Sequence, residues 1–146
     1  MPKRTRIALI VAAVLAAVGF VVALALWDAA HPLRYLRADR VVTAQLWPRA
    51  PRSRAGRDLS REEIAEFCRA LAAARSTEPV DTPGSVQVEL VTMDFGRVEV
   101  DDLSGPGARA ALFVGTPEEK RVTLRSAELG AFLARMGKSI ATDEHR

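Results

Sequence analysis

One uninterrupted run of hydrophobic residues lies close to the start of the chain. Residues 7–27 have the sequence IALIVAAVLAAVGFVVALALW, which contains no charged side chain. A helix of these 21 residues is roughly 31 Å long at ~1.5 Å of rise per residue, close to the ~30 Å hydrocarbon core of a bilayer. A helix also pairs every backbone N–H and C=O group at that depth. The run therefore predicts a transmembrane helix over residues 7–27.

A cleavable signal peptide is the main alternative for this segment. Basic residues precede the run, and small residues at 23–25 or 28–30 resemble a cleavage site. The run is nevertheless longer than the ~7–15 apolar residues of a signal-peptide core. We therefore expect a signal anchor that is retained in the mature protein.

Small residues mark one side of the predicted span. Ala12, Ala16 and Gly19 are three or four positions apart, so a helix places them on a shared face. Small side chains let a second transmembrane helix approach closely. This face is therefore a possible packing site for a partner helix.

The flanking charges bear on the orientation of the span. The tail of residues 1–6 is basic, but three arginines also follow the span within the window where positive charge counts. The comparison is nearly balanced. The proximity of the basic tail favours a cytoplasmic N-terminus and an extracytoplasmic C-terminal domain.

Residues 28–57 form a basic juxtamembrane segment. Residues 31–57 contain seven arginines and no lysine, and three of the arginines repeat at every third position. In a short helix along the membrane surface, these arginines would reach lipid phosphates while Leu33 and Leu36 dip toward the hydrocarbon. Such arginines are attracted to anionic headgroups. A solvated linker is the alternative that the sequence leaves open. The candidate membrane-surface residues are Trp27, Arg34, Tyr35, Arg37 and Arg40.

The pattern after this segment predicts a folded domain over residues 58–137. Residues 41–47 are rich in β-formers and are a possible first strand of that domain. Ser60 and Glu63 match a capping box, and apolar residues follow at helical spacing, so we expect a helix over residues 60–74. Its apolar stripe consists of Ile64, Phe67, Cys68, Leu71 and Ala74.

Four more strands are predicted from short apolar or alternating segments. Residues 86–93 and 97–100 alternate around an Asp-Phe-Gly turn, which is typical of a β-hairpin. Residues 110–114 and 121–124 form a second pair around a turn at 115–120. Consecutive strands joined by short turns favour an antiparallel sheet.

A second amphipathic helix is predicted at the end of the domain. Ser126 is its expected cap, and residues 138–146 are a polar tail that we expect to be frayed. Its apolar stripe consists of Leu129, Phe132, Leu133 and Met136. The predicted fold class is therefore α+β. One N-terminal transmembrane helix is followed by a small two-layer domain, in which a mostly antiparallel sheet of four to five strands carries two helices on one face.

Charge is divided unevenly along the chain. Residues 1–57 have a formal balance of +8 and residues 58–146 one of −5, which together give the net charge of +3. The domain itself is therefore acidic, which does not favour nucleic-acid binding. The basic segment also offers only Tyr35 and Trp47 as aromatic surfaces on which bases could stack. Arginine and alanine are frequent and lysine is rare, as is typical of GC-rich genomes, so the arginines have an explanation that needs no functional role. We expect a bacterial protein of the cell envelope.

Residues that catalysis or metal binding needs are sparse. A single cysteine, Cys68, excludes an intramolecular disulfide and a cysteine-based zinc cluster, and its place on an apolar stripe predicts a buried side chain. His31 and His145 lie far apart in the sequence and lack a third ligand. The sequence contains no nucleophile elbow, zincin, Walker or dinucleotide-binding motif. We therefore expect no catalytic residue, no cofactor and no metal site.

An acidic group on the first hairpin is the remaining candidate for a binding site. Carboxylates alone can bind calcium, but the spacing of these residues fits no EF-hand loop. Outward charges on a hairpin also serve simply to keep a sheet edge soluble, which is the interpretation we favour. The group consists of Asp94, Glu99, Asp101 and Asp102.

These observations lead to two hypotheses of function. The first is a non-enzymatic, single-pass membrane-anchored protein whose α+β domain mediates protein–protein contacts at the membrane surface, as an accessory subunit or assembly factor of a membrane complex. Its partners would be the lipid bilayer, with anionic headgroups among its contacts, and a membrane protein. The alternative is an envelope ligand-binding or sensing module that uses the sheet face or the acidic hairpin.

Overall fold

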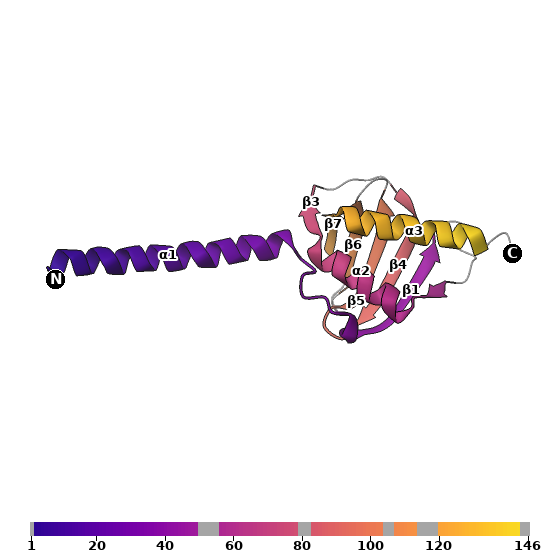
Figure 1. Ribbon diagram of the computed structural model, residues 1–146, viewed down its shortest axis with the longest axis horizontal. Coiled ribbons are helices and arrows are strands. Elements are labelled where there is room, and N and C mark those ends of the chain that lie inside the picture. Colours follow the sequence, from indigo (N-terminus) through magenta and orange to yellow (C-terminus); the bar gives the residue numbers. More distant parts are fainter. Residues whose placement is uncertain (1, 50–55, 79–82, 104–106, 114–119, 144–146) are drawn as a thin grey trace. The chain divides into compact units, whose positions relative to one another are not determined.

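The chain forms two units, residues 1–30 and residues 31–146. The computed structural model describes residues 2–49, 56–78, 83–103, 107–113 and 120–143. The first unit is the single helix α1 (Lys3–Ala30), which contains the whole predicted span of residues 7–27 (Figure 1). The second unit holds all the remaining helices and strands of the described residues.

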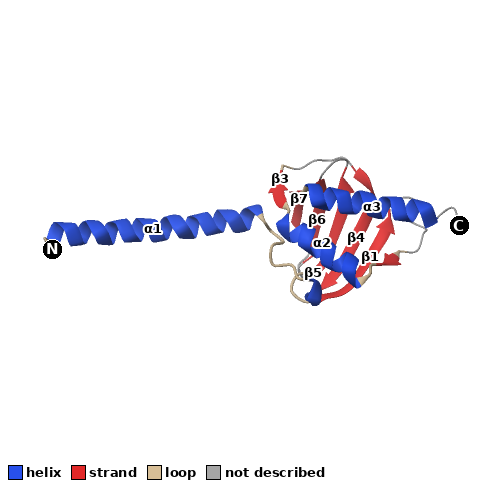
Figure 2. Ribbon diagram, in the orientation of Figure 1, coloured by secondary structure: helices blue, strands red, loops and turns tan. Residues whose placement is uncertain are grey.

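The second unit is an antiparallel sheet with two helices on one face (Figure 2). The described strands follow the order β2-β1-β4-β5-β6-β7-β3, and all of the pairings are antiparallel. This arrangement confirms the predicted fold class. The elements are the short helix η1 (Ala38–Arg40), β1 (Val41–Pro48), β2 (Arg57–Asp58), α2 (Arg61–Ala73), β3 (Arg75–Thr77), β4 (Pro83–Thr92), β5 (Gly96–Leu103), β6 (Gly107–Phe113), β7 (Lys120–Arg125) and α3 (Ala127–Asp143).

The sheet contains the five predicted strands and two short ones that the sequence did not predict. Residues 41–47 form β1, which pairs with β4 and so belongs to the sheet. The two unpredicted strands, β2 and β3, lie at the two edges of the described sheet. They are two and three residues long, too short to carry any periodicity. The predicted turn at 115–120 falls almost wholly outside the described residues.

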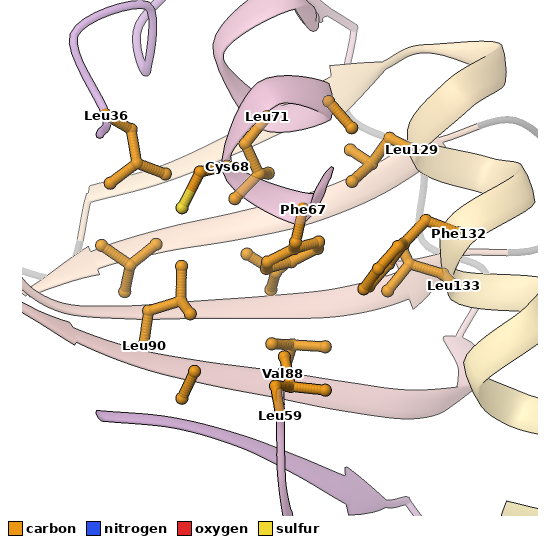
Figure 3. Close-up of a cluster of buried hydrophobic side chains, with 14 of the residues drawn as sticks. Leu36, Leu59, Phe67, Cys68, Leu71, Val88, Leu90, Leu129, Phe132 and Leu133 are labelled. Atoms are coloured by element: carbon orange, nitrogen blue, oxygen red, sulfur yellow. The ribbon is translucent and has the colours of Figure 1, made fainter. Parts of the chain in front are cut away.

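The core lies between the helices and one face of the sheet. Both predicted apolar stripes point into it, because all their members are buried except Ile64, which is half-buried against it. Phe67 of α2 stacks on Phe132 of α3 with ring centroids 4.9 Å apart (Figure 3). Val88 and Leu90 of β4 are fully buried beneath the helices. The two helices are therefore joined to each other and to the sheet by one apolar cluster.

The turn between β4 and β5 is fixed by local hydrogen bonds. The Thr92 hydroxyl donates to the carbonyl of Gly96 at 3.1 Å and accepts the N–H of Phe95 at 2.9 Å. Gly96 has a φ of 67°, a conformation that favours glycine over residues with a Cβ. The predicted Asp-Phe-Gly turn is confirmed.

The last helix is longer than the sequence indicated. Ser126 accepts the N–H of Leu129 at 3.4 Å, as expected of its cap, but α3 continues to Asp143 instead of fraying from residue 138. Ile140 packs against the core from this extension, and the Thr142 hydroxyl donates to the carbonyl of Lys138 at 2.9 Å. A single large apolar residue in a polar tail gives little periodic signal, so the sequence did not predict this extension.

An ion pair links the edge strand β2 to the start of α2. Arg57 donates to both oxygens of Glu63, at 2.9 and 3.0 Å. Glu63 also accepts the N–H of Ser60 at 2.8 Å, and the Ser60 hydroxyl accepts the N–H of Glu63, so the predicted capping box is confirmed. The hydrogen bonds from Arg57 lower the pKa of the Glu63 carboxyl below its ordinary value of 4.5.

Glu63→Gln should therefore destabilise the domain in a pH-dependent manner. Glutamine keeps an acceptor for the capping box but loses the charge, so we expect the free energy of unfolding to fall by about 1 to 2 kcal/mol at neutral pH. A carboxyl with a lowered folded-state pKa stabilises the fold above its unfolded pKa and loses this contribution as the pH falls through its folded pKa. The difference from the wild type should thus begin to shrink as the pH falls below 4.5 and disappear only below the folded-state pKa of Glu63. Urea denaturation across a pH series measures it.

The matched control is Glu62→Gln, which removes the same charge from the same helical turn. The exposed Glu62 lies in the first turn of α2, where any carboxylate gains from the helix dipole. An equal loss in both variants would show that the Arg57 pair adds nothing beyond that general effect.

Candidate membrane interface

Helix α1 exposes apolar side chains on every side. It has 28 residues, none of which is buried, and it is long and apolar enough to cross a membrane. Its length is roughly 42 Å at about 1.5 Å per residue, which exceeds the ~30 Å thickness of the hydrocarbon core. The excess includes the polar and basic residues 3–6 at the N-terminal end of the helix. Apolar surface left in water costs about 25 cal/mol per Å², so such a helix is unfavourable outside lipid or a partner. The part of the chain that the structure describes thus contains one candidate membrane-spanning helix.

The small residues of α1 share an uncovered face. Successive helical residues are about 100° apart, which places Ala12, Ala16 and Gly19 within a sector of roughly 60°. All three are exposed. A Cβ atom built on Gly19 meets nothing within 4 Å. Nothing in the described part of the chain therefore opposes a larger side chain at Gly19.

The leucines of the juxtamembrane segment lie in the core of the domain. Leu33 is fully buried and Leu36 is 5% exposed, and both belong to the main apolar cluster (Figure 3 shows Leu36). They are therefore neither dipping into lipid nor part of a solvated linker. His31, the first residue after α1, is also buried. The folded unit consequently begins directly where α1 ends.

Two of the candidate membrane-surface arginines form ion pairs with aspartates. Arg37 contacts Asp39 at 3.0 Å, and Arg40 contacts Asp94 of the β4–β5 turn at 3.1 Å. The hydrogen bond from Arg40 to Asp94 raises the pKa of Arg40. These carboxylates offset charge that the sequence analysis assigned to lipid phosphates.

The aromatic candidates are exposed. Trp27 is 51% and Tyr35 is 61% exposed. The Arg34 guanidinium lies 4.4 Å from the centre of the Tyr35 ring and donates to its hydroxyl. Tyr35 therefore presents its amphipathic ring at the surface of the domain, as aromatic residues do in the headgroup region of a membrane.

Two of the acidic residues of the hairpin form ion pairs with arginines. Asp94 contacts Arg40, and Glu99 contacts Arg97 at 2.6 Å. No three His, Cys, Asp or Glu side chains in the described ranges come together so as to hold a metal ion. The group named from the sequence was Asp94, Glu99, Asp101 and Asp102.

The other reactive candidates are buried or lie beyond the described residues. Cys68 is 2% exposed, and burial raises the pKa of its thiol to about 11, so it is protonated near neutral pH. The prediction of a buried apolar cysteine is confirmed. His145 falls outside the described residues.

Two apolar residues of the domain, neither of them predicted as a site from the sequence, are exposed. Val42 is 58% exposed at the start of β1, and Met93 is 68% exposed after the end of β4. Each is a single apolar residue within or beside a predicted strand, where alternation gives it no distinguishing signal.

Comparisons of the chain with family models, with curated proteins and with solved structures gave no match.

Proposed function

We propose that this is a non-enzymatic, single-pass membrane-anchored protein whose α+β domain makes protein–protein contacts at the membrane surface, as an accessory subunit or assembly factor of a membrane complex. We place the N-terminus in the cytoplasm and the domain outside it, in a bacterial envelope. The basic residues at the immediate start of α1 support this orientation, which a topology reporter fused after residue 146 can read.

The observation that supports this proposal best is the direct passage from an uncovered apolar helix into a folded domain. Ala30 ends α1, and the buried residues His31 and Leu33 follow at once. A helix anchored in lipid would therefore hold the domain close to the bilayer without a long linker. At that position the domain lies within reach of membrane-embedded partners.

In addition to the contacts of the α+β domain, we propose that the small-residue face of α1 packs against a helix of the same membrane partner. Leucine at both Ala16 and Gly19 would fill the space that a neighbouring helix needs for close approach. We expect the double variant Ala16→Leu/Gly19→Leu to reduce the amount of co-purifying membrane partner by about tenfold, equivalent to ~1.4 kcal/mol. Purification of the full-length protein from native membranes in mild detergent, with quantitative mass spectrometry, measures this.

A matched control lies on the opposite side of α1. Val21 is roughly 180° from the small-residue face at about 100° per residue, so Val21→Leu adds bulk where no partner is assigned. Equal partner recovery from both variants would exclude this face as the contact. Wild-type protein recovered reproducibly alone and monomeric would contradict the proposed function itself.

A further inference from the structure

Exposed apolar side chains of the domain gather at one end of its sheet. Val41 pairs with Thr92 in the antiparallel ladder between β1 and β4, and the register of this ladder shifts at Val42. Because the strands are antiparallel, Met93 lies opposite Arg40, two residues before Val42. The N–H of Met93 donates to the carbonyl of Arg40 at 2.9 Å. Outside α1, and among the residues whose side-chain exposure the structure describes, the exposed large hydrophobic residues are Tyr35, Val42 and Met93.

This end of the sheet is joined to α1 by a short stretch of chain. Val42 is twelve residues beyond Ala30. Even a fully extended chain of twelve residues spans only ~40 Å, which is therefore the largest possible distance between Ala30 and Val42. In the structure, part of this stretch is folded against the core, so the true reach is shorter. A tether of this kind gives the surface a high effective concentration at the membrane that holds α1.

The charges beside these residues are largely balanced. Arg37 is paired with Asp39 and Arg40 with Asp94, and the Arg40 guanidinium lies 3.8 Å from the Met93 sulfur. A surface with paired charges gains little from anionic lipid. Its attraction to a bilayer would come from apolar burial in the boundary between headgroups and acyl chains.

We propose that Val42 and Met93 insert into the headgroup region of the bilayer that anchors α1, and that this contact does not require anionic lipid. The inference rests on the proposed anchoring of the protein and adds a second membrane contact, which fixes one end of the sheet against the surface. The sheet and its two helices would then have a defined orientation over the membrane instead of rotating freely about residue 30.

Spin labels at the two positions test the insertion. The full-length variants Val42→Cys and Met93→Cys are labelled and reconstituted in phosphatidylcholine vesicles. Their collision rates are then measured with oxygen, which concentrates in the bilayer, and with a water-soluble nickel chelate. We expect an oxygen-to-nickel ratio several-fold higher than at Arg69→Cys, an exposed position on α2. Cys68 need not be replaced in these variants. Its thiol is buried and stays protonated at the labelling pH, so it does not react with the spin label.

Each outcome decides the inference. The ratio should be the same with and without anionic phosphatidylglycerol, and a ratio that rises only with anionic lipid would overturn the apolar contact. Labels as accessible to nickel as the one on α2 would overturn it, as would labels shielded from both reagents, which indicate a protein partner or second copy. Vesicle flotation separates the two proposals. A protein that floats with water-exposed labels contradicts only this inference, whereas one that does not float contradicts the anchoring.

Discussion

Phe67→Ala is expected to lower the free energy of unfolding of the domain by about 3 to 5 kcal/mol. The Phe67 side chain is fully buried and stacks on Phe132, so its removal leaves a cavity between α2, α3 and the sheet. The loss has two parts, the transfer free energy of the removed ring atoms and the contacts that the cavity lining no longer makes. An aromatic pair of this geometry adds roughly 0.5 to 1.5 kcal/mol beyond area burial.

Urea denaturation of the full-length protein in detergent, followed by near-ultraviolet circular dichroism, measures this loss. Arg69→Ala is the matched control, because Arg69 is an exposed residue two positions along the same helix. Surface substitutions of this kind change stability by no more than about 0.5 kcal/mol. A loss below about 1 kcal/mol for Phe67→Ala would mean that the two helices are not held together through this ring.

The predictable part of the fold is the part with a long, regular pattern. The stripe from Ile64 to Ala74 repeats over several turns and ends in the buried surface that the spacing implies. The capping box at Ser60 is equally local, because both of its hydrogen bonds join residues three apart. Local regularity of this kind depends little on the rest of the chain, so it can be inferred from sequence alone.

The juxtamembrane segment shows where a local pattern is ambiguous. Leucines among arginines are typical of a helix at the membrane surface, but the same spacing also suits a segment whose leucines enter a core. The structure buries Leu33 and Leu36 in the core and leaves Val42 and Met93 exposed instead. The core that buries the two leucines is built from residues far along the chain, such as Phe67 and Leu90, so the local pattern could not reveal it.

Strand length separates Asp94 from Asp102, the two ends of the acidic group on the hairpin. Asp94 lies in the turn, whereas Asp102 is six residues beyond Gly96 in β5. At ~3.3 Å per residue, the strand alone separates Gly96 and Asp102 by roughly 20 Å. Nearness in sequence on an extended strand therefore does not bring side chains together. The ability of α1 to span a membrane could be predicted from the sequence, because it depends on the length and composition of the segment and not on contacts between distant residues.

The largest functional effect is expected from charges placed inside α1. Leu15 and Val18 lie near the middle of the apolar run, and both are exposed. An arginine at the centre of a transmembrane helix costs about 2.5 to 3.5 kcal/mol, and each apolar residue that it replaces contributes about −0.3 to −0.6 kcal/mol. The double variant Leu15→Arg/Val18→Arg should thus shift membrane partitioning by ~6 to 8 kcal/mol, or more than about 10⁴-fold.

Alkaline carbonate extraction and vesicle flotation of the full-length protein measure this shift. Leu15→Ala/Val18→Ala is the control, because it shortens the same side chains without charge and should leave the protein in the membrane fraction. The domain should stay folded in both variants, since residues 31–146 form a unit separate from α1 and keep their core. A double arginine variant that still resists carbonate would show that α1 is not the anchor. Wild-type protein recovered soluble and trimmed at its N-terminus would identify the segment as a cleaved signal peptide, and the partner contact assigned to α1 would then fall with it.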